Sequence, residues 1–147
     1  LSCIRPAGTV GRANAIAEKA MITSLDQFCI NVSDLERAVR FYEQALGLAV
    51  THRIEIPGVS EVVLAGAGGS RIQLARHHDH EGAIDHGNAL WKLYLNTDDC
   101  AGLYARAIEA GAEAVSPPQL LAQWQVTAAF IKDPDGYQIE IIQQHSG

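Results

Sequence analysis

The fold is decided by a strand followed by the start of a helix, in the stretch Gln27-Phe28-Cys29-Ile30-Asn31-Val32-Ser33-Asp34-Leu35-Glu36. A second stretch repeats the strand and again leads into a helix pattern, Lys92-Leu93-Tyr94-Leu95-Asn96-Thr97. Each copy later has a strand with one polar residue between two apolar ones, Ile72-Gln73-Leu74 and Ile139-Glu140-Ile141. The separation between Gln27 and Lys92 along the chain is nearly the same as that between Gln73 and Glu140. The chain therefore predicts a duplicated unit that brings four matched positions together around a pseudo-twofold axis: Gln27, Gln73, Lys92 and Glu140.

The first copy is expected to form one strand, one helix and three more strands. Residues alternate in character from Leu25 to Val32, which predicts a half-buried strand with Gln27, Cys29 and Asn31 on one face. Ser33 and Glu36 have the spacing of a capping box at the helix start, and Gly47 is expected to end that helix. Further strands are predicted over residues 48–54, 59–65 and 71–76, separated by a Pro-Gly turn and a glycine-rich turn.

The second copy repeats this order. A strand is predicted over residues 90–96, and the following helix is capped by Thr97 or Asp98 and ended by Gly111. A short strand over 112–115 comes before a loop opened by Ser116-Pro117-Pro118, and strands follow over 125–131 and 137–143. The expected fold class is α+β, with tandem βαβββ modules forming a curved mixed sheet around a cavity. The expected domain covers 23–147, as a module at 23–76, a linker at 77–88 and a module at 89–147.

Length and composition indicate one compact globular domain. The chain has 147 residues and a net charge of −6 without a basic cluster, which argues against binding to nucleic acid or to an anionic membrane. No apolar run is long enough for a membrane span. The cysteines lack metal-type spacing, and Cys29 and Cys100 are expected to be buried thiols in a reducing compartment. A cytoplasmic protein is therefore expected. Because Met21 directly precedes the first strand, residues 1–22 are interpreted as an N-terminal extension.

Three runs of sequence carry a family resemblance: Val32-Ser33-Asp34-Leu35-Glu36-Arg37-Ala38, Phe41-Tyr42-Glu43-Gln44-Ala45-Leu46-Gly47-Leu48 and Phe130-Ile131-Lys132-Asp133-Pro134-Asp135-Gly136-Tyr137-Gln138-Ile139-Glu140. On these residues the chain resembles the vicinal oxygen chelate superfamily, which includes glyoxalase I and the bleomycin-resistance proteins. The resemblance implies a homodimer, in some relatives with each site built by both chains. It does not choose a reaction, because this family includes lyases, isomerases, dioxygenases and drug-binding proteins.

The four matched positions correspond to the metal ligands of the resembling metalloenzymes, which are typically a His or Gln, a Glu, a His and a Glu. Here Gln27 and Glu140 are compatible with that set, whereas Gln73 replaces a carboxylate and Lys92 replaces a histidine. An ammonium has no lone pair to donate and adds a positive charge beside the ion. We therefore expect no metal and no other cofactor at these residues, with a weakly bound divalent metal as the open alternative.

The expected site instead uses Lys92 and Glu140 as catalytic groups. The Lys92 ammonium is expected to pair with Glu140, to donate hydrogen bonds to the two glutamine oxygens and to hold a carboxylate or carbonyl oxygen of a small-molecule ligand. Glu140 is the candidate general base. Strand parity and loop position add the candidate substrate-binding residues Gln27, Gln73, Asn31, Arg71, Tyr94 and Trp124. The competing interpretation is an ion pair that only fills a vestigial metal site.

Two functions compete on these grounds. The first is a lyase or isomerase of glyoxalase type, acting on a small oxygenated metabolite. The second is a non-catalytic protein of bleomycin-resistance type that binds and sequesters a small molecule. A ring-cleaving dioxygenase is disfavoured because its iron needs two histidines and a carboxylate. The histidines at 77, 78, 80 and 86 lie in a Gly- and Asp-containing linker, which favours a solvated connection over a metal site.

Overall fold

The computed structural model describes residues 21–145, so residues 1–20 of the expected extension lie outside the described part. The first module contains strand β1 (Gln27–Asn31), helix α2 (Leu35–Arg40), the π-helical turn η1 (Phe41–Ala45), and strands β2 (Ala49–Ile56), β3 (Val59–Ala65) and β4 (Arg71–His77). Its strands are ordered β1-β4-β3-β2, with β1 parallel to β4 and the other neighbours antiparallel.

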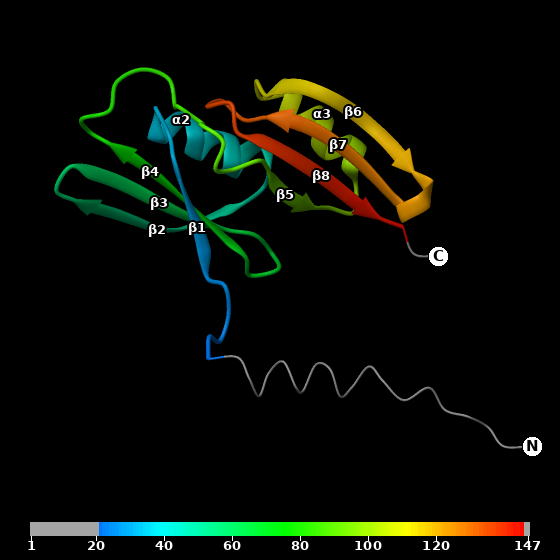
Figure 1. Ribbon diagram of the computed structural model, residues 1–147, viewed down its shortest axis with the longest axis horizontal. Helices are drawn as coiled ribbons and strands as arrows, with labels where there is room; N and C mark the ends of the chain where they lie inside the picture. Colours follow the sequence, from blue (N-terminus) through cyan, green and yellow to red (C-terminus); the bar gives the residue numbers. More distant parts are fainter. Residues whose placement is uncertain (1–20, 146–147) are drawn as a thin grey trace, which may run out of the picture.

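The second module repeats this topology. It contains strand β5 (Leu93–Asn96), helix α3 (Cys100–Glu109), strand β6 (Glu113–Leu121), the 3₁₀ turn η2 (Ala122–Trp124), and strands β7 (Val126–Lys132) and β8 (Gln138–Gln144). The order is β5-β8-β7-β6, with β5 parallel to β8. Figure 1 shows the two sheets next to each other, with α2 and α3 each packed on the sheet of its own module. The expected α+β fold of tandem βαβββ modules is confirmed, as two four-stranded sheets that do not close into a barrel within residues 21–145.

The cap of α2 differs from the one expected, because Ser33 makes long-range contacts instead. The hydroxyl and the amide of Ser33 both donate to Asp135 of the second module, so Ser33 does not cap α2. Asp34 does so instead, accepting from the Arg37 amide at 2.9 Å. Glu36 pairs with Arg53 rather than reaching back to the helix start.

The cap of α3 also lies further along the chain than expected. Asp99 is the cap, rather than Thr97 or Asp98, and its carboxylate accepts from the Gly102 amide at 2.9 Å. A Cβ atom at position 102 would collide with that carboxylate, which explains the glycine in the first turn. Thr97 supports the cap by accepting from the Asp99 amide at 3.1 Å.

Two further expectations about local structure are wrong. Ser116-Pro117-Pro118 does not open a loop but lies within β6. An edge strand tolerates proline because one side of its backbone has no partner strand, and the pairing of β6 with β7 is irregular on both sides of Ser116. Cys29 is exposed rather than buried, because its face of β1 is uncovered, whereas Cys100 is fully buried as expected.

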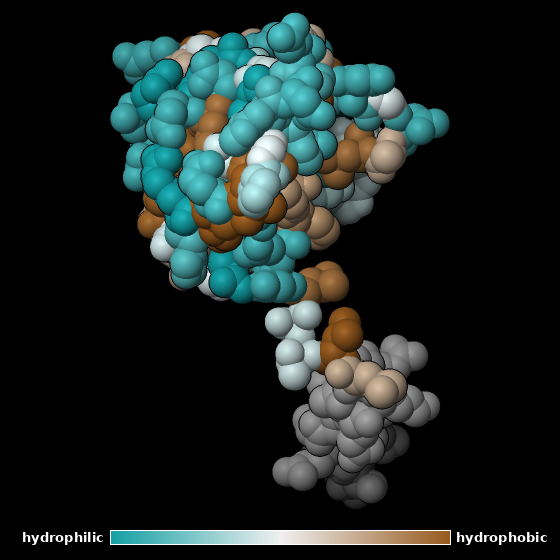
Figure 2. Space-filling view, turned by 90° about the vertical axis from the view of Figure 1, so that its left-hand side faces the viewer, coloured by the Kyte–Doolittle hydropathy of each residue, from teal (hydrophilic) through white to brown (hydrophobic). Residues whose placement is uncertain are grey.

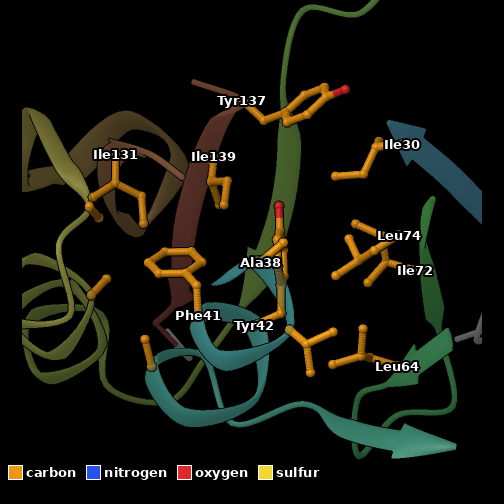
Figure 3. Close-up of a cluster of buried hydrophobic side chains, with 14 of the residues drawn as sticks. Ile30, Ala38, Phe41, Tyr42, Leu64, Ile72, Leu74, Ile131, Tyr137 and Ile139 are labelled. Carbon is orange, nitrogen blue, oxygen red and sulfur yellow. The ribbon is translucent and has the colours of Figure 1, made fainter. Parts of the chain in front are cut away.

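One hydrophobic core joins the two modules behind the sheets. Figure 3 shows Phe41 and Tyr42 of η1 between side chains of both modules, with Ile131 and Ile139 on one side and Leu64, Ile72 and Leu74 on the other. The outer side of the first module is by contrast mostly hydrophilic, with small hydrophobic patches (Figure 2). Apolar burial of this kind is the main favourable contribution to folding. Within the described part of the chain, neither helix has the length and apolar character needed to cross a membrane.

A buried carboxylate fastens the second module to the first. The Tyr42 hydroxyl donates to Oδ2 of Asp133 at 2.7 Å, and the amides of Asp135 and Tyr137 donate to Oδ1. The Tyr137 hydroxyl donates in turn to the Asn31 carbonyl at 2.7 Å. Burial raises the pKa of Asp133, and the hydrogen bonds from Tyr42 and the two amides oppose that rise.

We expect Tyr42→Phe to lower the free energy of unfolding by about 1–3 kcal/mol, because it removes a donor from a buried carboxylate. The loss should shrink toward acidic pH. The folded-state pKa of Asp133 is raised, so its ionised form is disfavoured in the folded protein, and protonation at low pH removes the need for the donor. Urea unfolding at several pH values measures this. Tyr104→Phe is the control, because the Tyr104 hydroxyl makes no hydrogen bond within residues 21–145; equal losses in the two variants would contradict the assignment.

Candidate functional site

An ion pair lies on the face of the second sheet that the helix does not cover. Lys92 comes directly before β5, and its Nζ atom lies 2.5 Å from Oε2 of Glu140 in β8. The Lys92 and Glu140 side chains are 10% and 12% exposed. The register explains the meeting, because Tyr94 of β5 lies opposite Glu140 and Lys92 precedes Tyr94 by two residues on the same face. The predicted pairing of Lys92 with Glu140 is present in the structure.

Aromatic rings surround the lysine. Nζ of Lys92 lies 4.1 Å from the ring centroid of Trp91, 4.9 Å from that of Tyr94 and 5.3 Å from that of Phe130. Phe130 of β7 lies opposite Glu140, so Tyr94, Glu140 and Phe130 form one row across three strands. The hydrogen bond to Glu140 raises the pKa of Lys92 above its ordinary value, although burial opposes this. Lys92 is therefore an ammonium at neutral pH.

The matching positions of the first module form a neutral pair. Nε2 of Gln27 donates to Oε1 of Gln73 at 2.6 Å. Cys29 and Val63 lie opposite Gln73 on its two neighbouring strands, as Tyr94 and Phe130 flank Glu140 in the other module. Among the described residues, no hydrogen bond or ion pair joins the Gln27–Gln73 pair to the Lys92–Glu140 pair. The four matched positions are thus two pairs on two sheets, and the expected contact between Lys92 and the glutamine oxygens is not formed within residues 21–145.

The remaining candidate binding residues are distributed around these pairs. Tyr94 lies at the ion pair, as described above. Arg71 is engaged by Asp26, and the Asn31 side chain lies 3.1 Å from Nε2 of His77. Trp124 is 65% exposed in η2 and is not among the rings around Lys92. The structure therefore brings Tyr94 to the ion pair, whereas Arg71, Asn31 and Trp124 have other neighbours.

Three residues near the pairs were not predicted from the sequence. Trp91 and Phe130 contribute two of the rings around Lys92. Glu61 of β3 shares a sheet face with Gln73. Burial of the Cys29 thiol raises its pKa, and the negative charge of Glu61 raises it further. Placing β7 and β8 in register across the tight turn at residues 133–136 would have put Phe130 beside Glu140. The position of Phe130 is thus encoded in the pairing of β7 with β8 and not in the pattern of either strand alone.

The linker histidines have separate partners. Nε2 of His78 lies 2.8 Å from the Ser60 hydroxyl, and Nε2 of His86 lies 2.8 Å from the Asp135 carbonyl. The His86 ring also packs edge-on against Tyr137. Between Met21 and His145, no three histidine, cysteine or acidic side chains are grouped as metal ligands. The linker is anchored to both modules through these histidines.

The residues at the four family positions do not fit a divalent metal ion. Glu140 supplies the single carboxylate, the two glutamines are neutral and bonded to each other, and Lys92 is a protonated amine. Two like unit charges 4 Å apart repel by about 4 kcal/mol at an effective dielectric of 20, and a divalent ion doubles this figure. The ammonium already supplies a positive charge at this position and lacks a lone pair for coordination.

Comparisons with known proteins agree with this fold. The family model described as Glyoxalase/Bleomycin resistance protein/Dioxygenase superfamily matches residues 24–141. The chain is 30% identical over 123 residues to a lactoylglutathione lyase of Neisseria meningitidis, covering 80% of this chain and 88% of that protein. Glyoxalase I of Leishmania major superposes with a TM-score of 0.72 at 23% identity, covering 84% and 88% of the two chains. Glyoxalase I of Zea mays superposes with a TM-score of 0.74 at 21% identity, covering 82% of this chain and 44% of the maize chain.

If two copies of the chain bring the two pairs together, we expect the double variant Gln73→Glu/Lys92→His to gain binding of Ni²⁺ or Zn²⁺, because it removes the ammonium and adds a second carboxylate and an imidazole. Titration calorimetry with each ion measures the gain. The single variant Gln73→Glu is the control, since it keeps the ammonium and should bind neither ion tightly. Stoichiometric, tight binding of either ion by the unaltered protein would contradict the charge assignment.

Proposed function

Because the chain belongs to the glyoxalase/bleomycin resistance protein/dioxygenase superfamily, we propose that it is a cytoplasmic, glyoxalase-I-like enzyme of lyase or isomerase type. It acts on a small oxygenated metabolite, with Lys92 and Glu140 in place of a metal-centred site. The observation that carries the proposal is the Lys92–Glu140 ion pair at 2.5 Å. It sets a fixed positive charge beside a carboxylate at two positions where the resembling metalloenzymes hold their ion.

The proposed chemistry is a proton transfer next to a carbonyl group. The Lys92 ammonium holds the carbonyl oxygen, and Glu140 removes a proton from the adjacent carbon. The electron pair of the broken C–H bond forms the enolate, whose oxygen is stabilised by the positive charge of Lys92. In a substrate with a hydroxyl group on that adjacent carbon, the hydroxyl proton moves to the enolate oxygen and Glu140 delivers its proton to the former carbonyl carbon. The carbonyl group has then moved to the neighbouring carbon without any net gain or loss of atoms.

The charge state of Lys92 supports an electrostatic role over a covalent one. A lysine that forms a Schiff base must lose its proton, and enzymes achieve this by lowering the lysine pKa. Here the hydrogen bond to Glu140 raises the pKa of Lys92 instead. A lysine held in its ammonium form is suited to binding an oxygen atom that carries or develops negative charge.

Sequestration of a small molecule, as in a bleomycin-resistance-type protein, is the second candidate function. The ring arrangement favours it, because Trp91, Tyr94 and Phe130 around one charge make a surface suited to binding a small molecule. The two candidates differ in whether Glu140 acts on the bound molecule.

We expect the protein to exchange carbon-bound hydrogen next to a carbonyl for deuterium in D₂O. Suitable probes are hydroxyacetone and the methylglyoxal–glutathione hemithioacetal, followed by proton NMR. Glu140→Gln should slow this exchange by about 100-fold or more, because general-base catalysis contributes at least that much. The matched control is Glu113→Gln, which changes an exposed carboxylate on the edge strand β6 and should leave the rate unchanged. Equal exchange in the unaltered protein and Glu140→Gln with both probes would favour the sequestration function.

Two copies of the chain are proposed to pair as a homodimer with shared sites. The face carrying Gln27 and Gln73 in one copy then lies opposite the face carrying the ion pair in the other. The separate location of the two pairs supports this, as does the exposure of Trp91 and Tyr94 beside the ion pair, at 76% and 59%. We expect sedimentation of the full chain to give a dimer. A monomer that retains activity dependent on Lys92 would overturn the shared site.

A further inference from the structure

The rings around Lys92 belong to the second module alone. The row across the second sheet is Tyr94, Glu140 and Phe130, whereas the equivalent row across the first sheet is Cys29, Gln73 and Val63. Trp91 adds a third ring at 4.1 Å from Nζ of Lys92. The duplicated backbone therefore does not require aromatic residues at these positions, and their presence is a property of the site around Lys92.

These rings offer a stacking surface around a charged group. Trp91 and Tyr94 are mostly exposed, although both are large and largely apolar, while the lysine between them is mostly covered. An exposed aromatic surface beside a mostly buried charge is typical of a ligand-binding position, because large apolar groups on a soluble protein are normally buried. In the proposed homodimer these rings would line the space between the two copies.

The lysine has hydrogen-bonding capacity left for an anion. An ammonium has three donors, and Glu140 accepts one of them at 2.5 Å. The Tyr94 hydroxyl is a second polar neighbour that helps to raise the lysine pKa, and the other neighbours are the ring faces of Trp91 and Phe130. Neutral groups of these kinds attract the charge less strongly than a charged oxygen that accepts a hydrogen bond. A ligand carboxylate that approaches Nζ on the side away from Glu140 would replace a weak contact with a strong one.

We propose that this site selects a flat anionic ligand, an aromatic or heteroaromatic carboxylic acid whose carboxylate binds Nζ of Lys92 and whose ring packs against Trp91 and Tyr94. The inference rests on the proposed function, because it uses the same oxygen-binding role of Lys92, and it adds the class of molecule. Aromatic rings pair with one another in offset or edge-to-face arrangements more favourably than their buried area alone would give. Trp91 is thus a specificity-determining residue, and it takes no part in the proton transfer.

The test compares three probes on the full chain by NMR titration: benzoate, cyclohexanecarboxylate and benzamide. The first two are similar in size and both ionised at pH 7.5, so they differ mainly in aromatic character, while benzamide keeps the ring and lacks the charge. We expect benzoate to bind roughly two- to tenfold more tightly than cyclohexanecarboxylate, from the usual strength of aromatic pairs. Benzamide should bind more weakly than either. Benzoate affinity should stay constant from about pH 7 to 9, because Lys92 remains protonated over that range.

Variants assign the preference to a residue. Trp91→Leu should remove most of the advantage of benzoate over cyclohexanecarboxylate and leave the affinity for cyclohexanecarboxylate nearly unchanged. Because the Trp91 side chain is exposed, this variant is expected to fold normally. Phe28→Leu is the matched control, because Phe28 is an exposed ring on β1 in the other sheet and lies on the opposite face of that strand from Gln27. Lys92→Met should abolish binding of both carboxylates.

The outcomes separate the inference from the function on which it rests. Equal affinities for the two carboxylates, both lost in Lys92→Met, would overturn the aromatic preference and leave the oxygen-binding role of Lys92 standing. Benzamide binding as tightly as benzoate would overturn the selection for an anion. Carboxylate binding that is absent, or unaffected by Lys92→Met, would overturn the oxygen-binding role itself, and the inference with it.

Discussion

The ion pair between Lys92 and Glu140 is the constraint that shapes the uncovered face of the second sheet, and the proposed chemistry depends on it. The two opposite charges lie on a sheet face with most of their surface covered, so each charge is stabilised mainly by the other. Taking such charges out of water is costly, and a pair of this kind persists only when its geometry is good and its remaining donors find partners. The rings of Trp91, Tyr94 and Phe130 supply attraction for the ammonium on the sides that Glu140 does not occupy. The pair thus gives this sheet face a fixed dipole.

The two modules have the same strand topology but different side chains at equivalent positions. Gln27 and Gln73 satisfy each other as neutral amides at 2.6 Å. The equivalent residues Lys92 and Glu140 are charged, and only they are flanked by aromatic rings. A scaffold that supports many reactions can change its function by replacing a few side chains at fixed positions on the strands. The two modules therefore present different groups on equivalent sheet faces: an ion pair with aromatic rings in the second, and two neutral amides in the first.

Much of this could be predicted from residue pattern alone, and the failures share one cause. Period-two alternation placed Gln27, Gln73, Lys92 and Glu140 on their sheet faces, because alternation is a local property of a strand. The predicted cap of α2 was wrong, since Ser33 donates to Asp135, a residue far along the chain. Phe130 was missed because its position beside Glu140 depends on the pairing of β7 with β8. Cys29 was expected to be buried because a strand pattern does not show which face another element covers.

The connection between core and site runs through the tight turn at residues 133–136. That turn joins β7 to β8 and so sets the register that places Phe130 opposite Glu140. Asp133 holds the turn by accepting from the amides of Asp135 and Tyr137, and the Tyr42 hydroxyl binds the same carboxylate from the first module. Tyr42 in turn packs in the core shared by both modules (Figure 3). The turn that precedes β8 is therefore held both by its own backbone amides and by a hydrogen bond from the first module.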